Sequence, residues 1–110
     1  MNKLWIAMIA AVGLAAAGGA VAGGDVAKGK EKSALCATCH GADFNTPIMP
    51  EYPKLAGQPH DYLEKALRDY KSGKRKNPLM APMAQNLSSQ DMKDLAAYFS
   101  SLSGDLKVKY

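Results

Sequence analysis

The stretch Cys36-Ala37-Thr38-Cys39-His40 decides the fold of this 110-residue chain, because it holds both cysteines and one of the two histidines. Two intervening residues let one helical turn present both sulfur atoms on the same side, with the imidazole of His40 directly after them. A pair of thiols in this arrangement serves several chemistries: a redox-active dithiol, a zinc site, a disulfide or the attachment of a cofactor. The rest of the sequence decides between them.

The segment upstream of this stretch differs from the rest of the chain. Within residues 1–22, Lys3 is the only charged residue, a long apolar run follows it, and small residues end in an A-x-A site at positions 20–22. A positive start, an apolar segment and such a site are typical of a secretory signal peptide. We predict that residues 1–22 are cleaved and that residues 23–110 form one exported domain. An uncleaved membrane anchor is the alternative, which the alanine and glycine content of the run argues against.

An exported domain of this length is short for a self-sufficient core. Small exported domains commonly add disulfides, a metal or another staple. Cys36 and Cys39 allow one bridge at most, which would close a tiny loop and constrain little of the unfolded chain. In an exported protein, C-x-x-C-H is the attachment pattern of haem c, bound through two thioether bonds. The sequence therefore predicts that a covalent haem completes the core, with His40 as an axial ligand of the iron.

Three other interpretations of the thiols fit less well. A thioredoxin-like dithiol needs a βαβ context, and no strand pattern precedes Cys36. A zinc site would have to recruit His60 and lacks the usual second pair of closely spaced ligands. In addition, His40 follows Cys39 too closely to join both sulfurs in a tetrahedron. A lone disulfide is the third interpretation.

An electron-carrying haem needs a second axial ligand, and methionine opposite histidine is a common pairing. Two other methionines are poorer candidates for this ligand. Met92 falls on the apolar stripe of a predicted helix and is expected to pack in the core, and Met49 follows His40 too closely in the chain to pass easily around the edge of the haem. Met80 and Met83 lie in a segment whose two prolines predict a rigid extended loop rather than a regular helix. Spacing alone does not choose between these last two methionines.

Helix signals predict an all-α domain with three main helices. Asp25 caps a first helix that runs to about Cys39, and Gly29 within it predicts a close approach by another element. A second helix spans about residues 59–72. The third begins at the S-x-x-D capping box of residues 88–91 and carries a clear apolar stripe.

The segments between and after these helices predict no regular structure. Residues 41–59 contain several prolines and enough apolar side chains to predict a loop wrapped around a cofactor edge. No segment alternates convincingly as a strand. Residues 104–110 are predicted to form a short polar tail.

Three blocks of the sequence resemble class I cytochromes c. They are residues 29–41 around the cysteines, residues 52–58 (YPKLAGQ), and residues 80–99, which begin MAPM. Within that class the chain is similar to one haem domain of bacterial cytochrome c4, or to the small periplasmic c5 and c553 types. The resemblance implies the cytochrome c fold, with three main helices wrapped around one covalently bound haem. Cytochrome c4 has two haem domains in tandem, whereas a single C-x-x-C-H pattern implies one haem here.

The resemblance also implies roles for individual residues. The sulfur ligand of the family falls on Met80, which leaves Met83 as packing in the haem pocket. The carbonyl of Pro53 would accept the Nδ1 hydrogen of His40, a bond that orients the ring and raises its basicity. Leu55 would pack on the haem face.

A cluster of basic residues precedes the Met80 segment, namely Lys71, Lys74, Arg75 and Lys76. For Lys71 and Lys74 a solvated helix end is the favoured interpretation, and for the cluster as a whole a docking patch is an alternative. Arg75 or Lys76 is expected to pair with the haem propionates, since a partly buried anion attracts a nearby cation. The net charge of +4 is too small to indicate nucleic-acid binding.

The sequence therefore predicts a periplasmic electron carrier rather than an enzyme. An iron with two protein ligands has no vacant site and cycles between its ferric and ferrous forms with little rearrangement. The predicted partners are a quinol-oxidising complex or dehydrogenase on one side and a terminal oxidase or reductase on the other, met through small, weak interfaces. No membrane span is expected after cleavage. The alternative is a haem enzyme with peroxidase-like activity, if Met80 is displaced.

Overall fold

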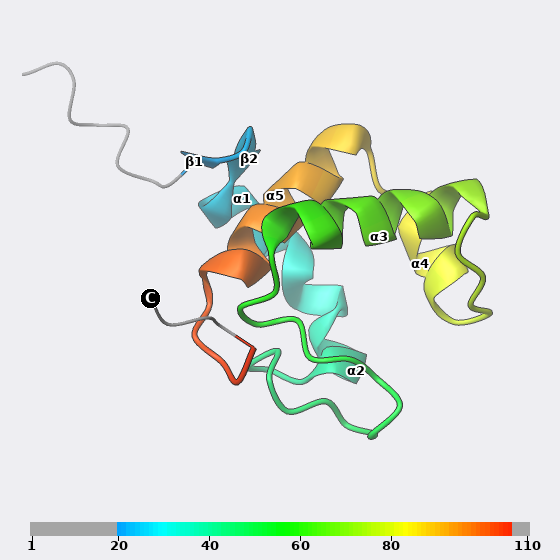
Figure 1. Ribbon diagram of the computed structural model, residues 1–110, viewed down its shortest axis with the longest axis horizontal. Coiled ribbons are helices and arrows are strands. Elements are labelled where there is room, and N and C mark those ends of the chain that lie inside the picture. Colours follow the sequence, from blue (N-terminus) through cyan, green and yellow to red (C-terminus); the bar gives the residue numbers. More distant parts are fainter. Residues whose placement is uncertain (1–19, 107–110) are drawn as a thin grey trace, which may run out of the picture.

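The computed structural model describes residues 20–106 (Figure 1). In chain order, its elements are β1 (Ala20–Val21), β2 (Gly24–Asp25), α1 (Val26–Lys32), the 3-10 helix η3 (Ser33–Leu35), α2 (Ala37–His40), α3 (His60–Ser72), α4 (Met80–Gln85) and α5 (Ser89–Ser101). The predicted leader lies outside the described residues except for its last three positions, and so do residues 107–110 of the predicted tail. The described part of the chain is mostly helical, as the sequence predicts.

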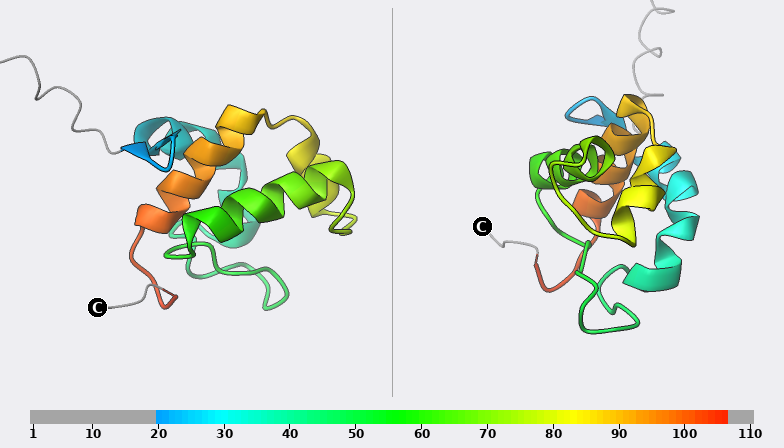
Figure 2. Two further views of the ribbon diagram at one scale, coloured as in Figure 1. Left: turned by 45° about the horizontal axis from the view of Figure 1, so that its top comes forward. Right: turned by 90° about the vertical axis from the view of Figure 1, so that its right-hand side faces the viewer.

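Helix α5 is the centre of the fold, with α1 and α3 packed against it (Figures 1 and 2). It begins at the predicted capping box, in which the Ser88 hydroxyl accepts from the Asp91 backbone N–H and the Asp91 carboxylate accepts from the Ser88 N–H. Its predicted apolar stripe is buried, and the core combines that stripe with residues of α3 and of the 41–59 segment. The buried core cluster consists of Phe44, Ala56, Leu63, Leu95, Ala96 and Phe99.

The crossing of α1 and α5 depends on Gly29. A Cβ atom at this position would lie 2.0 Å from the Asp94 carbonyl oxygen and 2.7 Å from Cβ of Tyr98. Only a residue without a side chain allows the two backbones to approach this closely. The expected close approach at Gly29 is therefore confirmed.

Asp94 joins α5 to β2 and α1. Its side chain is fully buried and accepts hydrogen bonds from the Asp25 backbone N–H at 2.9 Å, from Lys32 Nζ at 2.6 Å and from Gln90 Nε2 at 2.8 Å. Lys32 also pairs with Asp91 at 2.7 Å. A buried carboxylate with this many donors is held in one place, and it fixes β2 and α1 against α5.

The prediction of one continuous first helix is wrong. Asp25 caps α1 as expected, by accepting from the Lys28 N–H, but α1 ends at Lys32 and a 3-10 turn separates it from α2. The buried Ser33 explains the break, because its hydroxyl donates to the Lys30 carbonyl at 2.7 Å and competes with the regular helical pattern. The 3-10 turn leads directly into α2, so that Cys36 lies at the junction between the two and Cys39 lies within α2.

The prediction of no strands is wrong in one small respect. β1 and β2 form an antiparallel pair of two residues each. Ala22 and Gly23 connect them with positive φ angles of 50° and 81°, the backbone that a two-residue hairpin turn requires. The predicted cleavage bond joins these two turn residues.

The predicted second and third helices are confirmed as α3 and α5, with bounds within about one residue of those expected. Within residues 20–106 there is no helix with the length and apolar character needed to cross a bilayer.

Candidate haem-binding site

The cysteine pair lies on a helical turn, as its spacing predicts. Cys36 directly precedes α2 with helical backbone angles, and its carbonyl accepts from the N–H groups of Cys39 at 3.2 Å and His40 at 3.0 Å. Both thiols are free, Cys36 half-buried and Cys39 exposed. Burial raises the pKa of the Cys36 thiol. Two unpaired sulfur atoms on one turn fit the attachment of a haem through adjacent vinyl groups.

The imidazole of His40 is buried and held by one hydrogen bond. Its Nδ1 lies 2.8 Å from the carbonyl oxygen of Pro53, and only 6% of the residue is exposed. Because a carbonyl oxygen only accepts, Nδ1 is the donor in this hydrogen bond, and Nε2 is the ring nitrogen left for another partner. An imidazole oriented in this way can bind a metal through Nε2. The structure thus contains the hydrogen bond that the resemblance implies between His40 and Pro53.

The 41–59 segment carries Pro53 to His40 through a set of backbone hydrogen bonds. The Phe44 carbonyl accepts from both Leu55 N–H at 2.8 Å and Ala56 N–H at 2.9 Å, which closes the segment into a loop. Gly57 N–H then donates to the Phe99 carbonyl of α5 at 2.9 Å. Leu55 is half-buried and packs against the core cluster. The loop is therefore anchored to the core on both sides of Pro53.

The segment that holds Met80 and Met83 is partly helical, which corrects the prediction of an extended loop. Met80 is the first residue of α4, and Pro82 is the third. Proline is tolerated there because the first N–H groups of a helix have no partner within it. The Asn77 side chain caps this start by accepting from the N–H groups of Leu79 at 2.9 Å and Met80 at 3.0 Å.

Helix α4 presents Met80 and Met83 on the same face, because residues three apart are neighbours on a helix. Met80 is half-buried, whereas Met83 is 39% exposed. Met92, by contrast, is buried in α5, as expected for a core residue. The geometry of α4 does not choose between Met80 and Met83.

Large apolar side chains remain exposed on the segments that carry these candidate ligands. The described part of the chain has seven exposed large hydrophobic residues, and five of them lie beside the cysteine turn, in the loop before Pro53, or in or next to α4: Leu35, Ile48, Met49, Leu79 and Met83. Large apolar side chains left exposed on the segments with the candidate ligands support the binding of an apolar group there. Together with the free thiols and the oriented imidazole, they fit a haem.

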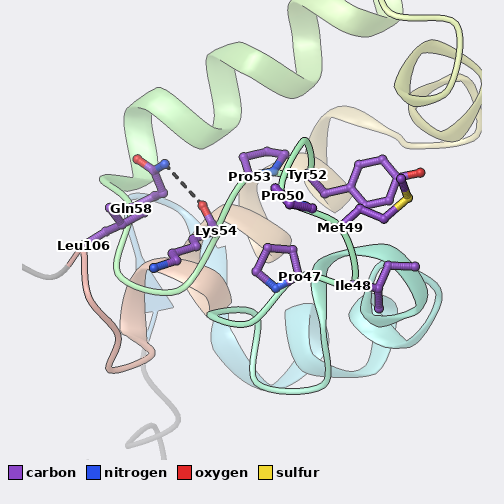
Figure 3. Close-up of a pocket in the computed structure, with 9 residues that line it drawn as sticks. All are labelled: Pro47, Ile48, Met49, Pro50, Tyr52, Pro53, Lys54, Gln58 and Leu106. Carbon is purple, nitrogen blue, oxygen red and sulfur yellow. Dashed lines mark hydrogen bonds between the residues drawn. The ribbon is translucent and has the colours of Figure 1, made fainter.

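A groove of about 510 Å³ runs along the outside of the loop (Figure 3). It is lined by Pro47, Ile48, Met49, Pro50, Tyr52, Pro53, Lys54, Gln58 and Leu106. Cys36, Cys39, His40 and Met80 are not among these residues. The groove shares Pro53 with the candidate site but does not itself contain the candidate ligands.

The basic cluster lies between α3 and α4. The Arg75 guanidinium is stacked 4.9 Å from the centre of the Tyr70 ring, and its Nη1 lies 3.3 Å from the Tyr62 hydroxyl. Lys71 Nζ donates to the Leu87 carbonyl, whereas Lys76 is exposed. The pairing of Arg75 or Lys76 with haem propionates stays a prediction.

Two residues near the site were not expected from the sequence. Tyr52 lies against His40, with 6.4 Å between the ring centroids. The Asn77 side chain accepts from the N–H groups at the start of α4, and the signal for it was present, since Asn followed by Pro favours the start of a turn. No local pattern indicates the contact of Tyr52, because its partner is distant along the chain.

Comparison with known proteins decides the family. Residues 26–103 match the family model described as "Cytochrome c". The chain belongs to the cytochrome c family. The family implies a covalently bound haem c, in agreement with the thiols and imidazole of α2.

Among the relatives of this cytochrome c is "Cytochrome c4" of Pseudomonas aeruginosa, which is 50% identical over 101 residues, covering 92% of this chain and 49% of that protein. "Cytochrome c-554(548)" of Halomonas halodenitrificans is 47% identical over 76 residues, covering 66% of this chain and 90% of that protein. A solved structure of reduced recombinant cytochrome c4 from Pseudomonas stutzeri has a TM-score of 0.69 and 45% identity, covering 74% of this chain and 47% of that one. The chain spans about half the length of the cytochrome c4 relatives.

Proposed function

We propose that this cytochrome c carries single electrons in the periplasm by cycling one haem c between its ferric and ferrous forms. The observation that carries the proposal is the pair of free thiols next to the buried imidazole of His40, whose ring is oriented by the Pro53 carbonyl, because these residue types in this arrangement support covalent haem attachment with histidine as a ligand. The electrons would come from a quinol-oxidising complex or a dehydrogenase and pass to a terminal oxidase or reductase. The full activity and the partners belong to this proposal.

Three residues of the turn at positions 36–40 would hold the cofactor. Cys36 and Cys39 would fix its position and orientation through two thioether bonds, and His40 would bind the iron through Nε2. When bound, haem c supplies the one-electron ferric/ferrous couple. The Pro53 carbonyl keeps the Nδ1 proton in place, which makes the imidazole a more basic ligand and favours the ferric form. This chain therefore tunes the couple through a backbone group.

Met80 is the proposed second axial ligand, and Met83 the proposed neighbour in the pocket. The resemblance to the family and the half-buried position of Met80 at the start of α4 support this assignment. A thioether ligand favours the ferrous form and raises the reduction potential. Two protein ligands also leave no coordination site for peroxide, which is why a carrier is favoured over a peroxidase-like enzyme.

The first test is a pyridine haemochrome assay on the purified protein. We expect one covalent haem per chain, and a chain without covalent haem would contradict the whole proposal. The ferric protein should show a sulfur-to-iron charge-transfer band. A high-spin ferric spectrum together with a rapid reaction with peroxide would instead support the peroxidase-like alternative.

The ligand assignment is tested by two matched variants on one face of α4. Met80→Ala should abolish the charge-transfer band, because it removes the sulfur atom, while Met83→Ala should retain the band. A Met80→Ala protein that keeps the band would move the assignment to Met83. Haem content should be the same in both variants, because neither residue takes part in attachment.

Export and processing are also part of the proposal. The A-x-A site supports cleavage between Ala22 and Gly23. N-terminal sequencing of protein from the periplasmic fraction should begin at Gly23. Recovery of the full chain in the membrane fraction would support the anchor instead.

A further inference from the structure

The segment after α5 folds back onto the loop that holds His40. The backbone N–H of Asp105 donates to Asn45 Oδ1 at 2.9 Å, and the Asp105 carboxylate pairs with Lys54 Nζ at 2.6 Å. Leu106 lines the same groove as Pro53 and Lys54 (Figure 3). The sequence predicts residues 104–110 only as a short polar tail. In the structure, the first residues of this segment pack against the loop.

The contact is close enough to depend on the absence of a side chain at Gly104. A Cβ atom there would lie 2.8 Å from Asn45 Oδ1, 2.9 Å from Cβ of Ala56 and 3.0 Å from the Ala56 carbonyl oxygen. Asn45 lies near the start of the 41–59 loop and Ala56 near its end, and we call these two parts the legs of the loop. The segment after α5 therefore packs against both legs. We call the four residues Asn45, Lys54, Gly104 and Asp105 the tail clamp.

The tail clamp acts on the peptide that orients His40. The carbonyl of Pro53 belongs to the peptide bond with Lys54, so any rotation of that peptide moves the acceptor of the His40 Nδ1 proton. Tyr52 N–H donates to the Met49 carbonyl at 3.1 Å before this peptide, and Leu55 N–H donates to the Phe44 carbonyl at 2.8 Å after it. Between these anchors, the side chain of Lys54 is held by Asp105, and the Lys54 carbonyl accepts from Gln58 Nε2 at 3.3 Å.

We propose that Lys54 and Asp105 are positioning residues, which hold the Pro53 carbonyl on His40 and thereby set the strength of the axial ligand. The inference rests on the proposed function, since His40 must bind the iron. Loosening the tail clamp lets the Pro53–Lys54 peptide rotate and weakens the Nδ1 hydrogen bond. A less strongly bonded imidazole is a less basic ligand and stabilises the ferric form less, so the reduction potential rises.

The size of the effect follows from the exposure of the ion pair. The side chains of Lys54 and Asp105 are 40% and 65% exposed, and an exposed pair is weak and is screened by salt. For Asp105→Asn in the holoprotein we expect exchange of the His40 Nδ1 proton to be about 1.5- to 5-fold faster, the range that corresponds to such a pair. The reduction potential should shift upward, and both effects should shrink at high salt.

Gly104→Ala provides a stronger perturbation of the same contact. Its methyl group would displace the segment from both legs of the loop, so we expect exchange roughly tenfold faster or more. This effect should not depend on salt, because it is steric. The difference in salt dependence separates the two ways of opening the tail clamp.

The matched control is Glu64→Gln on α3. It breaks an ion pair with Arg68 of the same 2.6 Å length, changes the net charge by the same amount and lies outside the loop. Nδ1 exchange, measured by NMR, should be unchanged in this variant. The inference is wrong if Asp105→Asn and Gly104→Ala both exchange like Glu64→Gln and their potentials shift no more than that of this control.

The experiment distinguishes this failure from a failure of the proposed function. Wild-type protein without covalent haem overturns the proposed function. Wild-type protein with haem and an unchanged Nδ1 proton in the variants overturns the tail clamp alone.

Discussion

The two sides of the proposed haem site are built differently. The histidine side, residues 36–58, contains the buried residues His40, Phe44 and Ala56 and is bonded to α5 through the Gly57 N–H. The methionine side, residues 73–88, is exposed over residues 73–79, and α4 buries only Ala84. Its hydrogen bonds are mostly local, such as the cap by Asn77, or run to the end of α3.

The fold therefore constrains the segment with His40 more strongly than the segment with Met80. A segment with buried residues and long-range hydrogen bonds opens only with the core, whereas a short, exposed helix opens at lower cost. We therefore expect the proposed bond between iron and Met80 to break under milder conditions than the proposed bond with His40. The following predictions test this asymmetry.

The largest expected effect contrasts two glycines with nearly the same φ. Gly41 on the histidine side has φ of 89°, and Gly73 on the methionine side has φ of 88°. A Cβ atom at Gly41 would lie 2.1 Å from the Thr46 carbonyl oxygen, while at Gly73 no atom of the described residues lies within 4 Å. Gly41→Ala should cost about 3 kcal/mol or more, because backbone strain and overpacking add. Gly73→Ala should cost only the strain, about 1 kcal/mol.

Chemical denaturation of the two holoproteins measures this contrast. Equal losses of unfolding free energy in the two variants would show that the sides are equally constrained. A Gly41→Ala chain that fails to accumulate, beside a normal Gly73→Ala chain, would support the asymmetry.

A smaller effect on stability is expected from Asp94, which joins β2 and α1 to α5. Burial opposes ionisation of Asp94, but hydrogen bonds from Lys32, the Asp25 N–H and Gln90 outweigh it and lower the pKa from 3.8 to about 2. Because the pKa of Asp94 is lower in the folded than in the unfolded chain, the ionised carboxylate stabilises the fold at every pH above the unfolded-state pKa. This stabilisation is lost as the pH falls from about 4 to 2. The contribution amounts to about 2 kcal/mol.

Denaturation of wild type and Asp94→Asn between pH 6 and pH 2 checks this prediction. The stability difference between them should narrow as the pH falls, because the wild-type carboxylate becomes protonated. A constant difference across that range would refute the role of ionised Asp94. The comparison cancels acid effects on the iron ligands, which the two proteins share.

The smallest effect is expected at the start of α4. Asn77→Ala removes the side chain that caps this helix and should cost about 1 kcal/mol. The loss should lower the temperature at which the sulfur-to-iron band disappears more than the temperature of global unfolding. Asn86→Ala, at the exposed far end of α4, is the matched control. Equal shifts of both transitions would mean that the methionine side opens only with the whole fold.

Local sequence patterns predicted the elements whose stability is decided within a turn or two. The capping box at Ser88 and the apolar stripe led to α5, and the C-x-x-C-H spacing led to the turn of α2. The errors arose where a neighbour changed the outcome. Ser33 ended α1 by bonding to the Lys30 carbonyl, and Pro82 was accepted in the first turn of α4, where it disrupts nothing.

The candidate site was predictable only in part for the same reason. The pairing of His40 with Pro53 was expected only from the resemblance, and nothing in the spacing of these residues requires it. The contact of Tyr52 with His40 and the docking of Asp105 onto Lys54 had no local signal. Each joins residues that meet only because the 41–59 segment returns to the core.

The attachment turn and the three blocks that resemble the family were enough to predict a helical cytochrome c with one attachment turn for haem. The break in the first helix and the contact of the segment after α5 with the loop became visible only in the folded chain, where the hydrogen bond between His40 and Pro53 that the resemblance implied is also present. These features depend on hydrogen bonds and close contacts between residues distant in the chain. Their geometry exists only once α1, α3 and the loop have packed around α5.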